Sequence, residues 1–195
     1  MYEYNGYKDS KIILTFATVK DRKLLNIELG RVRPDEYAAL PPSGLVLVLD
    51  NIRSAHNVGS IFRSGDAFKA DKVYLCGISA VPPSAEIHKS ALGAELSMPW
   101  EHVGDTLELV NRLRGEGYTV VSVEQTCNAV QLQNFVPQEG VRYALVLGNE
   151  VDGVRQDVVD ASDFALEIPQ FGAKHSLNVS VSAGVVLWQF CRFVK

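Results

Sequence analysis

The fold is decided by the stretch LVLVLDNIRSAHNVGSIFRS at residues 45–64. It opens with an unbroken apolar run from Leu45 to Leu49, which has the length of a strand and is typical of one buried on both faces. A polar loop follows, and the spacing of apolar residues then predicts a helix over residues 57–69. A buried strand that leads directly into a helix is the repeating unit of a parallel α/β sheet.

The same alternation continues toward the C-terminus. Short apolar runs predict further strands, and apolar residues at helical spacing predict the helices between them. We therefore predict an α/β fold, with a parallel sheet and helices on both of its faces. The expected strands are residues 73–76, 118–123, 143–147 and 164–168, and the expected helices lie near residues 86–92, 107–113 and 177–193.

Composition favours one compact domain with a short extension. The chain has 195 residues, of which 47% are hydrophobic, and this is enough apolar material for one core. The turn Pro41-Pro42-Ser43-Gly44 divides an N-terminal extension, residues 1–42, from a main domain, residues 43–195. The extension is either an RNA-contacting patch or a solvated face, because it carries the positive residues Lys11, Lys20, Arg22, Lys23, Arg31 and Arg33.

Charge and hydropathy exclude several classes of protein. A formal net charge of −4 argues against indiscriminate binding to polyanions. No apolar run is long enough to span a membrane, and the polar N-terminus is unlike a secretory signal, so we expect a cytoplasmic protein. The scattered Cys76, Cys127 and Cys191 fit neither a disulfide framework nor a zinc site, and we expect reduced core thiols.

Three polar loops follow predicted strands, at the edge where open α/β sheets bind ligands. In the first loop, Asn57 is placed to be a helix N-cap, a role that does not exclude a functional one, and Arg63 is either an exposed helix residue or part of a site. The second loop, GNEVDGV at residues 148–154, places Glu150 between two glycines. Such a turn is either structural or a close approach to a ligand, and it is neither a phosphate loop nor a dinucleotide fingerprint.

The third loop, residues 168–184, leads into the apolar C-terminal helix. Ser176 is placed to cap that helix, and the small residues after it permit close approach of another segment. His175 beside Ser176 does not indicate a hydrolase, because adjacent residues rarely meet side by side and no G-x-S-x-G elbow is present.

Together the three loops resemble the three motifs of the SpoU, or TrmH-like, branch of the SPOUT methyltransferases. NVGSIFRS at residues 57–64 is similar to the first motif, LVLGNEVDGV at 145–154 to the second, and the stretch from Ile168-Pro169 to Val181 to the third. The resemblance covers about residues 44–194. It implies RNA 2′-O-ribose methylation, a C-terminal deep trefoil knot, and a homodimer with the site at the subunit interface.

The resemblance also implies a cofactor and a set of site residues. S-adenosylmethionine would be held in the knot, no metal would be needed, and the substrate would be structured RNA, either tRNA or rRNA. Arg63 would act closest to the reaction, as the base by resemblance or by aligning a phosphate on physical grounds, since Arg stays protonated. Asn57, Glu150, Ser176 and Asn178 would position the ribose and the cofactor. The cofactor-binding residues implied are Ser122, Val123, Glu124, Leu147, Gly148, Asn149, Ile168, Pro169, Ser176, Leu177 and Asn178.

Two other functions compete with this interpretation. The acidic charge and the small periphery fit a catalytically idle relative that binds RNA or scaffolds a partner, although such a protein has no need to keep the motif residues together. An α/β nucleotide-binding enzyme of another kind is disfavoured because the sequence has no phosphate loop.

Overall fold

The computed structural model describes residues 22–33 and 36–191, and the chain divides into two compact units, residues 1–32 and 33–195. In the first unit a short 3-10 helix, η1, spans Asn26–Leu29. The Glu28 carboxylate accepts the backbone N–H of Leu25 at 2.6 Å and pairs with the Arg22 guanidinium at 2.6 Å. Lys11 and Lys20 of the predicted basic cluster lie outside the described residues, and RNA contact by residues 1–42 stays a prediction.

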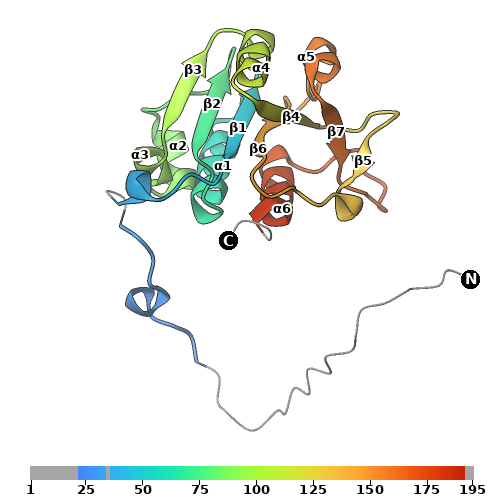
Figure 1. Ribbon diagram of the computed structural model, residues 1–195. Coiled ribbons are helices and arrows are strands. Elements are labelled where there is room, and N and C mark those ends of the chain that lie inside the picture. The colour runs from blue at the N-terminus through green and yellow to red at the C-terminus, as the bar shows by residue number, and fades with distance from the viewer. Residues whose placement is uncertain (1–21, 34–35, 192–195) are drawn as a thin grey trace, which may run out of the picture. The chain divides into compact units, whose positions relative to one another are not determined.

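The described part of the second unit is built on a seven-stranded sheet in the order β3-β2-β1-β6-β4-β7-β5 (Figure 1). Every neighbouring pair of strands is parallel. This confirms the predicted fold class. The strands are β1 (Leu45–Asp50), β2 (Lys72–Cys76), β3 (Trp100–Val103), β4 (Tyr118–Val123), β5 (Val130–Gln131), β6 (Arg142–Leu147) and β7 (Phe164–Glu167).

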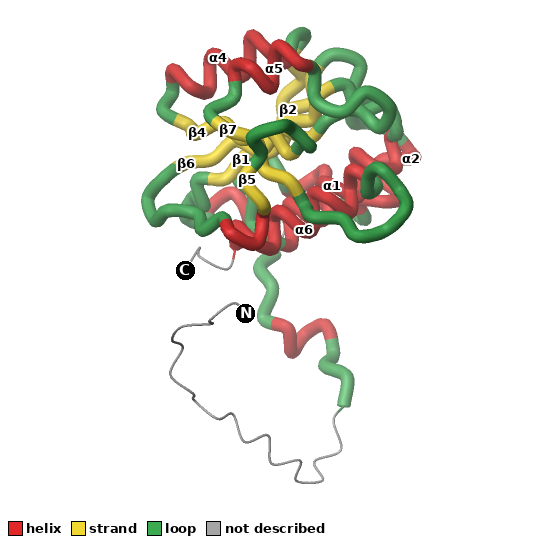
Figure 2. The backbone as a smooth tube through the Cα atoms, turned by 90° about the vertical axis from the view of Figure 1, so that its right-hand side faces the viewer, coloured by secondary structure: helices red, strands yellow, loops and turns green. Residues whose placement is uncertain are grey.

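Helices cover both faces of this sheet (Figure 2). Helices α4 and α5 lie on one face, and α1, α2 and α6 lie on the other. No helix of residues 22–33 and 36–191 has the length and hydropathy that crossing a membrane requires. The helices are α1 (Ala55–Ala67), α2 (Ala85–Ala91), α3 (Ala94–Ser97), α4 (Thr106–Gly115), α5 (Gln156–Ala161) and α6 (Val179–Cys191), with 3-10 helices η2 (Tyr37–Ala39) and η3 (Leu132–Asn134).

A hydrophobic core lies on each face of the sheet, and the unbroken apolar run of β1 contributes side chains to both. Leu45, Leu47 and Leu49 pack with α1, α2 and α6, whereas Val46 and Val48 pack with α4 and α5. All five side chains are buried, as expected for successive residues of a strand that point to opposite faces of a covered sheet.

The elements that the sequence missed are short or lie at the edges of the sheet. The edge strand β3 alternates between exposed and half-buried residues, β5 has two residues, and α5 has six. Of the three cysteines, Cys76 is buried but Cys127 is exposed, so the prediction of core thiols is wrong for Cys127. The trefoil knot stays a prediction.

Tyr37 belongs to the core of the second unit although the sequence places it in the N-terminal extension. Its side chain is 5% exposed and packs in the cluster around α1. Its hydroxyl donates a hydrogen bond to the Ala70 carbonyl at 2.9 Å. Burial, with the nearby Asp66 and Asp71, raises the pKa of Tyr37, so the hydroxyl stays a donor across the neutral range.

We expect Tyr37→Phe to lower the free energy of unfolding by about 1–2 kcal/mol, because the buried Ala70 carbonyl would lose its bond from the hydroxyl. Urea denaturation followed by circular dichroism measures this. The matched control is Tyr118→Phe, whose hydroxyl has no hydrogen bond within residues 22–33 and 36–191, and it should change stability by less than about 0.5 kcal/mol. Equal effects of the two substitutions would contradict a structural role for residue 37.

Candidate functional site

A cavity of about 550 Å³ lies at the carboxyl ends of β4, β6 and β7. In a parallel α/β sheet this edge presents loops and not strand backbone, so it is where ligand-binding groups collect. Three loops and the start of α6 line the cavity. Its lining residues are Val123, Glu124, Gln125, Leu147, Gly148, Asn149, Glu150, Val151, Asp152, Gly153, Leu166, Glu167, Ile168, Gln170, His175, Ser176, Leu177, Asn178, Val179 and Ser182.

The loop after β6 folds back on itself as a tight turn. The backbones of Asn149 and Gly153 exchange two hydrogen bonds, at 2.9 and 3.0 Å. Gly148 must be glycine because a Cβ there would lie 2.1 Å from the Gly153 carbonyl carbon. Gly153 has a φ of +69°, and a Cβ there would lie 2.2 Å from a Glu124 carboxylate oxygen. The two glycines therefore allow the backbone of this loop to pack against itself and against the Glu124 side chain.

Glu124 joins the loop after β4 to the loop after β6. Its Oε2 accepts the backbone N–H of Val154 at 2.9 Å, and its Oε1 accepts that of Gln125 at 2.8 Å. The Gln125 side chain then donates to the carbonyl of His175, in the loop after β7, at 2.7 Å. Side chains therefore connect all three loops around the cavity.

Glu150 connects the loop after β6 to the loop after β1. Its carboxylate accepts hydrogen bonds from the backbone N–H groups of Arg53 and Ser54, at 3.2 and 3.1 Å, and from Asn57 Nδ2 at 2.9 Å. Partial burial alone would raise the pKa of Glu150, but these hydrogen bonds to the charged form outweigh it and hold the pKa below its ordinary value. Glu150 is therefore an anion at neutral pH.

Asn57 passes this connection on to α6. Its Oδ1 accepts a hydrogen bond from Asn178 Nδ2 at 3.1 Å. Asn178 Oδ1 in turn accepts from the backbone N–H and the hydroxyl of Ser180, at 2.9 and 2.6 Å. Glu150, Asn57 and Asn178 thus form a continuous chain, which we call the carboxamide relay, across three elements that are distant in sequence.

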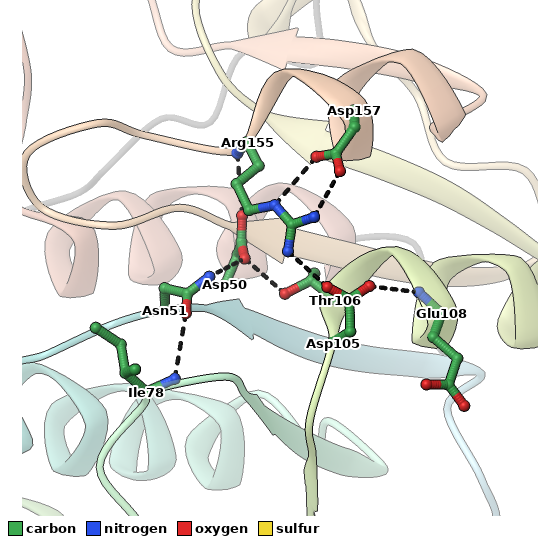
Figure 3. A network of polar contacts seen from close by, with 8 residues as sticks. All are labelled: Asp50, Asn51, Ile78, Asp105, Thr106, Glu108, Arg155 and Asp157. Atoms are coloured by element: carbon green, nitrogen blue, oxygen red, sulfur yellow. Dashed lines mark hydrogen bonds and ion pairs between the residues drawn. The ribbon is translucent and has the colours of Figure 1, made fainter.

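A second polar network holds the far end of the β6 loop (Figure 3). The buried Asp50, at the end of β1, accepts the backbone N–H of Arg155 at 3.0 Å and the Thr106 hydroxyl at 2.5 Å. The Arg155 guanidinium pairs with Asp105 at 2.7 Å and Asp157 at 2.5 Å. The loop that carries Glu150 is therefore fixed on both sides, at Asp50 and at the carboxamide relay.

The structure brings together most of the residues that the sequence singled out. Glu150 and Asn178 line the cavity and are joined through Asn57, and Ser176 also lines it. Arg63 is exposed on α1 and is not among the lining residues. Most of the predicted cofactor-binding residues also line the cavity: Val123, Glu124, Leu147, Gly148, Asn149, Ile168, Ser176, Leu177 and Asn178.

Two of the predicted cofactor-binding residues are not among the residues that line the cavity. Ser122 is fully buried, and its hydroxyl bonds that of Ser162 at 2.7 Å, so its side chain belongs to the framework behind the loop. Pro169 is not among the residues that line the cavity.

The helix caps also differ from the sequence analysis. Ser54, not Asn57, is the N-cap of α1, and its hydroxyl accepts the backbone N–H of Asn57 at 3.2 Å. Helix α6 begins at Val179, and Asn178, not Ser176, accepts its first backbone N–H groups. Because Ser54 supplies the cap, the Asn57 carboxamide is available for the relay.

Sequence reasoning missed the acidic character of the cavity. Its lining includes four acidic residues, Glu124, Glu150, Asp152 and Glu167, against one histidine, His175. Such a lining favours a positively charged ligand over an anionic one. Asp152 belongs to the loop at residues 148–154, and Glu167 stands near the end of a predicted strand. The sequence does not show that both line one cavity, because the fold brings them together.

The sequence is similar to those of known RNA-modifying proteins. The family model of the SpoU rRNA methylase family matches residues 44–188. The 23S rRNA (guanosine-2′-O-)-methyltransferase RlmB of Nitrosomonas europaea is 34% identical over 162 residues, covering 81% of this chain and 60% of that protein. A Staphylococcus aureus (strain COL) protein described as a TrmH family tRNA/rRNA methyltransferase is 31% identical over 147 residues, covering 75% and 58%. The chain thus spans about three-fifths of the length of these relatives.

The fold is shared with solved structures. The crystal structure of a TrmH/SpoU tRNA modifying enzyme from A. aeolicus matches with a TM-score of 0.72 at 24% identity, covering 82% of this chain and 79% of that one.

The lowered pKa of Glu150 predicts a pH dependence of stability. Its contribution should be complete above the ordinary glutamate pKa of about 4.3 and should disappear as the pH falls through the lower folded value. We expect Glu150→Gln to lose less stability than the unsubstituted protein between about pH 6 and about pH 3. Urea denaturation at both pH values measures this difference.

The matched control is Glu86→Gln, which removes an exposed carboxylate from α2. This variant should keep the pH dependence of the unsubstituted protein. If Glu150→Gln behaves in the same way, the hydrogen bonds to the Glu150 carboxylate do not stabilise the charged form.

Proposed function

The chain belongs to the SpoU rRNA methylase family, and we propose that it transfers a methyl group from S-adenosylmethionine to a ribose 2′-hydroxyl of tRNA or rRNA in the cytoplasm. The observation that carries the proposal is the carboxamide relay, which joins Glu150, Asn57 and Asn178 beside an acidic cavity. Each of these residues stands in one of the three motif stretches of the family.

The cavity suits the proposed cofactor on grounds of charge and size. S-adenosylmethionine would supply a methyl group on a positively charged sulfur; with its ammonium and its carboxylate it has a net positive charge, which the acidic residues of the lining favour. A volume of about 550 Å³ falls within the range of small-molecule sites. The backbone of residues 147–150 and 176–178 would hold it, since both stretches line the cavity.

The reaction requires alignment more than strong acid–base chemistry. The ribose oxygen forms a bond to the methyl carbon as the carbon–sulfur bond breaks, the bonding pair stays on sulfur, and the hydroxyl proton leaves to water or a nearby base. The carboxamide relay would fix the two loops and the helix that position these reactants. Its groups are already hydrogen-bonded, so they need no reorganisation on binding.

Arg63 would act on the RNA and not on the cofactor. It is exposed, lies outside the cavity lining, and makes no hydrogen bond or ion pair within the described part of the chain. A guanidinium keeps its proton at neutral pH, which makes it a poor base but a good bidentate partner for a phosphate. We therefore assign Arg63 to holding a phosphate near the target ribose.

The proposed assembly is a homodimer through α6. One face of this helix exposes Val181 (52%), Val185 (38%) and Trp188 (58%), at helical spacing. Trp188 also makes an edge contact with Phe68 of α1, with ring centroids 6.2 Å apart. An exposed apolar stripe of this kind is typical of a protein–protein interface, and the family resemblance favours a second copy of the chain.

The activity is tested by incubating purified protein with labelled S-adenosylmethionine and separate tRNA and rRNA fractions. We expect ribose methylation in at least one fraction, identified by nucleoside analysis. Calorimetry with the cofactor distinguishes the competing idle relative, which should fail to bind it. Cofactor binding without methylation of any RNA fraction would contradict the proposed reaction.

In this assay Arg63→Ala should lower turnover by about 100-fold or more, because the target ribose would lose its alignment. Cofactor affinity should not change, since Arg63 does not line the cavity. The control is Arg114→Ala, which removes from α4 a guanidinium that is paired with Asp163. This variant should keep full turnover. Full turnover of the Arg63 variant would overturn its assigned role.

For the dimer, we expect Trp188→Glu to convert the protein to a monomer in analytical ultracentrifugation, because a charge would be buried in an apolar interface. The control is Leu96→Glu, at a side chain that is 78% exposed on α3. Thermal unfolding of both variants checks that they remain folded. A dimer that persists in the folded Trp188 variant would exclude this face of α6 as the interface.

A further inference from the structure

Most lysine and arginine side chains of residues 36–191 already have a partner within those residues. The guanidinium of Arg142 bonds the carbonyl of Glu116 and lies over the Tyr118 ring. The others with partners form ion pairs within the described residues: Lys69 with Asp71, Lys72 and Arg112 with Glu101, Arg114 with Asp163, and Arg155 with Asp105 and Asp157. Four lysines and arginines of residues 36–191 remain without a side-chain partner there: Arg53, Arg63, Lys89 and Lys174.

These four residues are all exposed, and two of them, Arg53 and Lys174, stand in loops at the carboxyl edge of the sheet, which carries the cavity. Arg53 stands in the loop after β1, where its backbone binds Glu150. Lys174 stands in the loop after β7, next to the lining residue His175. Lys89 is on α2, which packs on α1 so closely that a Cβ on Gly59 would lie 2.4 Å from the Ile87 carbonyl. Arg63 lies further along α1.

The described residues of the unit therefore differ in charge between the cavity and its outside. Four acidic residues line the cavity, whereas the four cations without acid partners stand outside its lining, on the loops after β1 and β7 and on α1 and α2. The paired arginines of α4 and of the α5 entrance belong to the opposite face of the sheet. A phosphate approaching the four cations breaks no existing ion pair, so the full charge of each is available for binding.

We propose that Arg53, Lys89 and Lys174, together with Arg63, form the surface that holds the RNA phosphate backbone on either side of the target nucleotide. The inference rests on the proposed function, and it identifies which part of the second unit contacts the substrate. Contacts to phosphate position a nucleic acid without reading its sequence. Specificity for one nucleotide would then come from the shape of the RNA or from other segments of the protein.

The test measures RNA affinity of the full chain against salt concentration, using filter binding with a bulk tRNA fraction and a bulk rRNA fraction. We expect Lys89→Gln with Lys174→Gln to weaken RNA binding roughly tenfold at moderate salt. The slope of log affinity against log salt should fall by roughly one for each phosphate contact removed. Adding Arg53→Gln should weaken binding further, while calorimetry shows unchanged cofactor affinity for the double variant.

The matched control is Arg112→Gln with Arg114→Gln, which removes two cations that already have acid partners. This control should keep both the affinity and the salt slope. Equal effects of the two double variants, or no effect of Lys89 and Lys174, would overturn the proposed surface even if the protein methylates RNA. Selective loss of RNA binding in a protein that methylates no RNA would support the surface and contradict the proposed reaction.

Discussion

The hydrogen bonds of the Glu150 carboxylate are the interaction on which the site depends. They join the loop after β6 to the loop after β1 and orient Asn57, whose other end binds Asn178 at the start of α6. A carboxylate that accepts three hydrogen bonds constrains its neighbours strongly, because charge-assisted hydrogen bonds are stronger than those between neutral groups. Without it, the loop after β1 and the start of α6 would share only the neutral hydrogen bond between Asn57 and Asn178, and the loop after β6 would lose its hydrogen bonds to the loop after β1.

The same loop is fixed again on the C-terminal side of Glu150. Asp50 binds the Arg155 backbone, and Glu124 binds that of Val154, so the chain that follows Glu150 leaves the cavity along a defined path. Gly148 and Gly153 make this path sterically possible. Hydrogen bonds at several points along a loop keep its N–H and C=O groups in place for a ligand, and this pre-organisation lowers the free-energy cost of binding.

The sequence predicts the buried parts of this fold better than its edges. β4 has the predicted bounds, because its buried centre contains the apolar, β-branched Val120 and Val121 and the strand ends on Val123. The edge strand β3 and the two-residue β5 lack that constraint and carry no such pattern. Within the site, motif residues mark Asn57 and Glu150, but their hydrogen bond joins positions 93 residues apart and is created only by the pairing of β1 with β6.

Net charge is a weak guide to the partners of this protein because its charges are already grouped. The overall excess of acidic residues argues against indiscriminate RNA binding. Many of their carboxylates, however, already form ion pairs, cap helices or accept hydrogen bonds from the loops. A polyanion near the surface interacts mainly with the cations that have no acid partner. At physiological salt, screening limits their electrostatic attraction to about 8 Å. An acidic protein can therefore bind a polyanion at one place and repel it elsewhere, and under the proposed function the RNA would be confined to the surface that carries the unpaired cations.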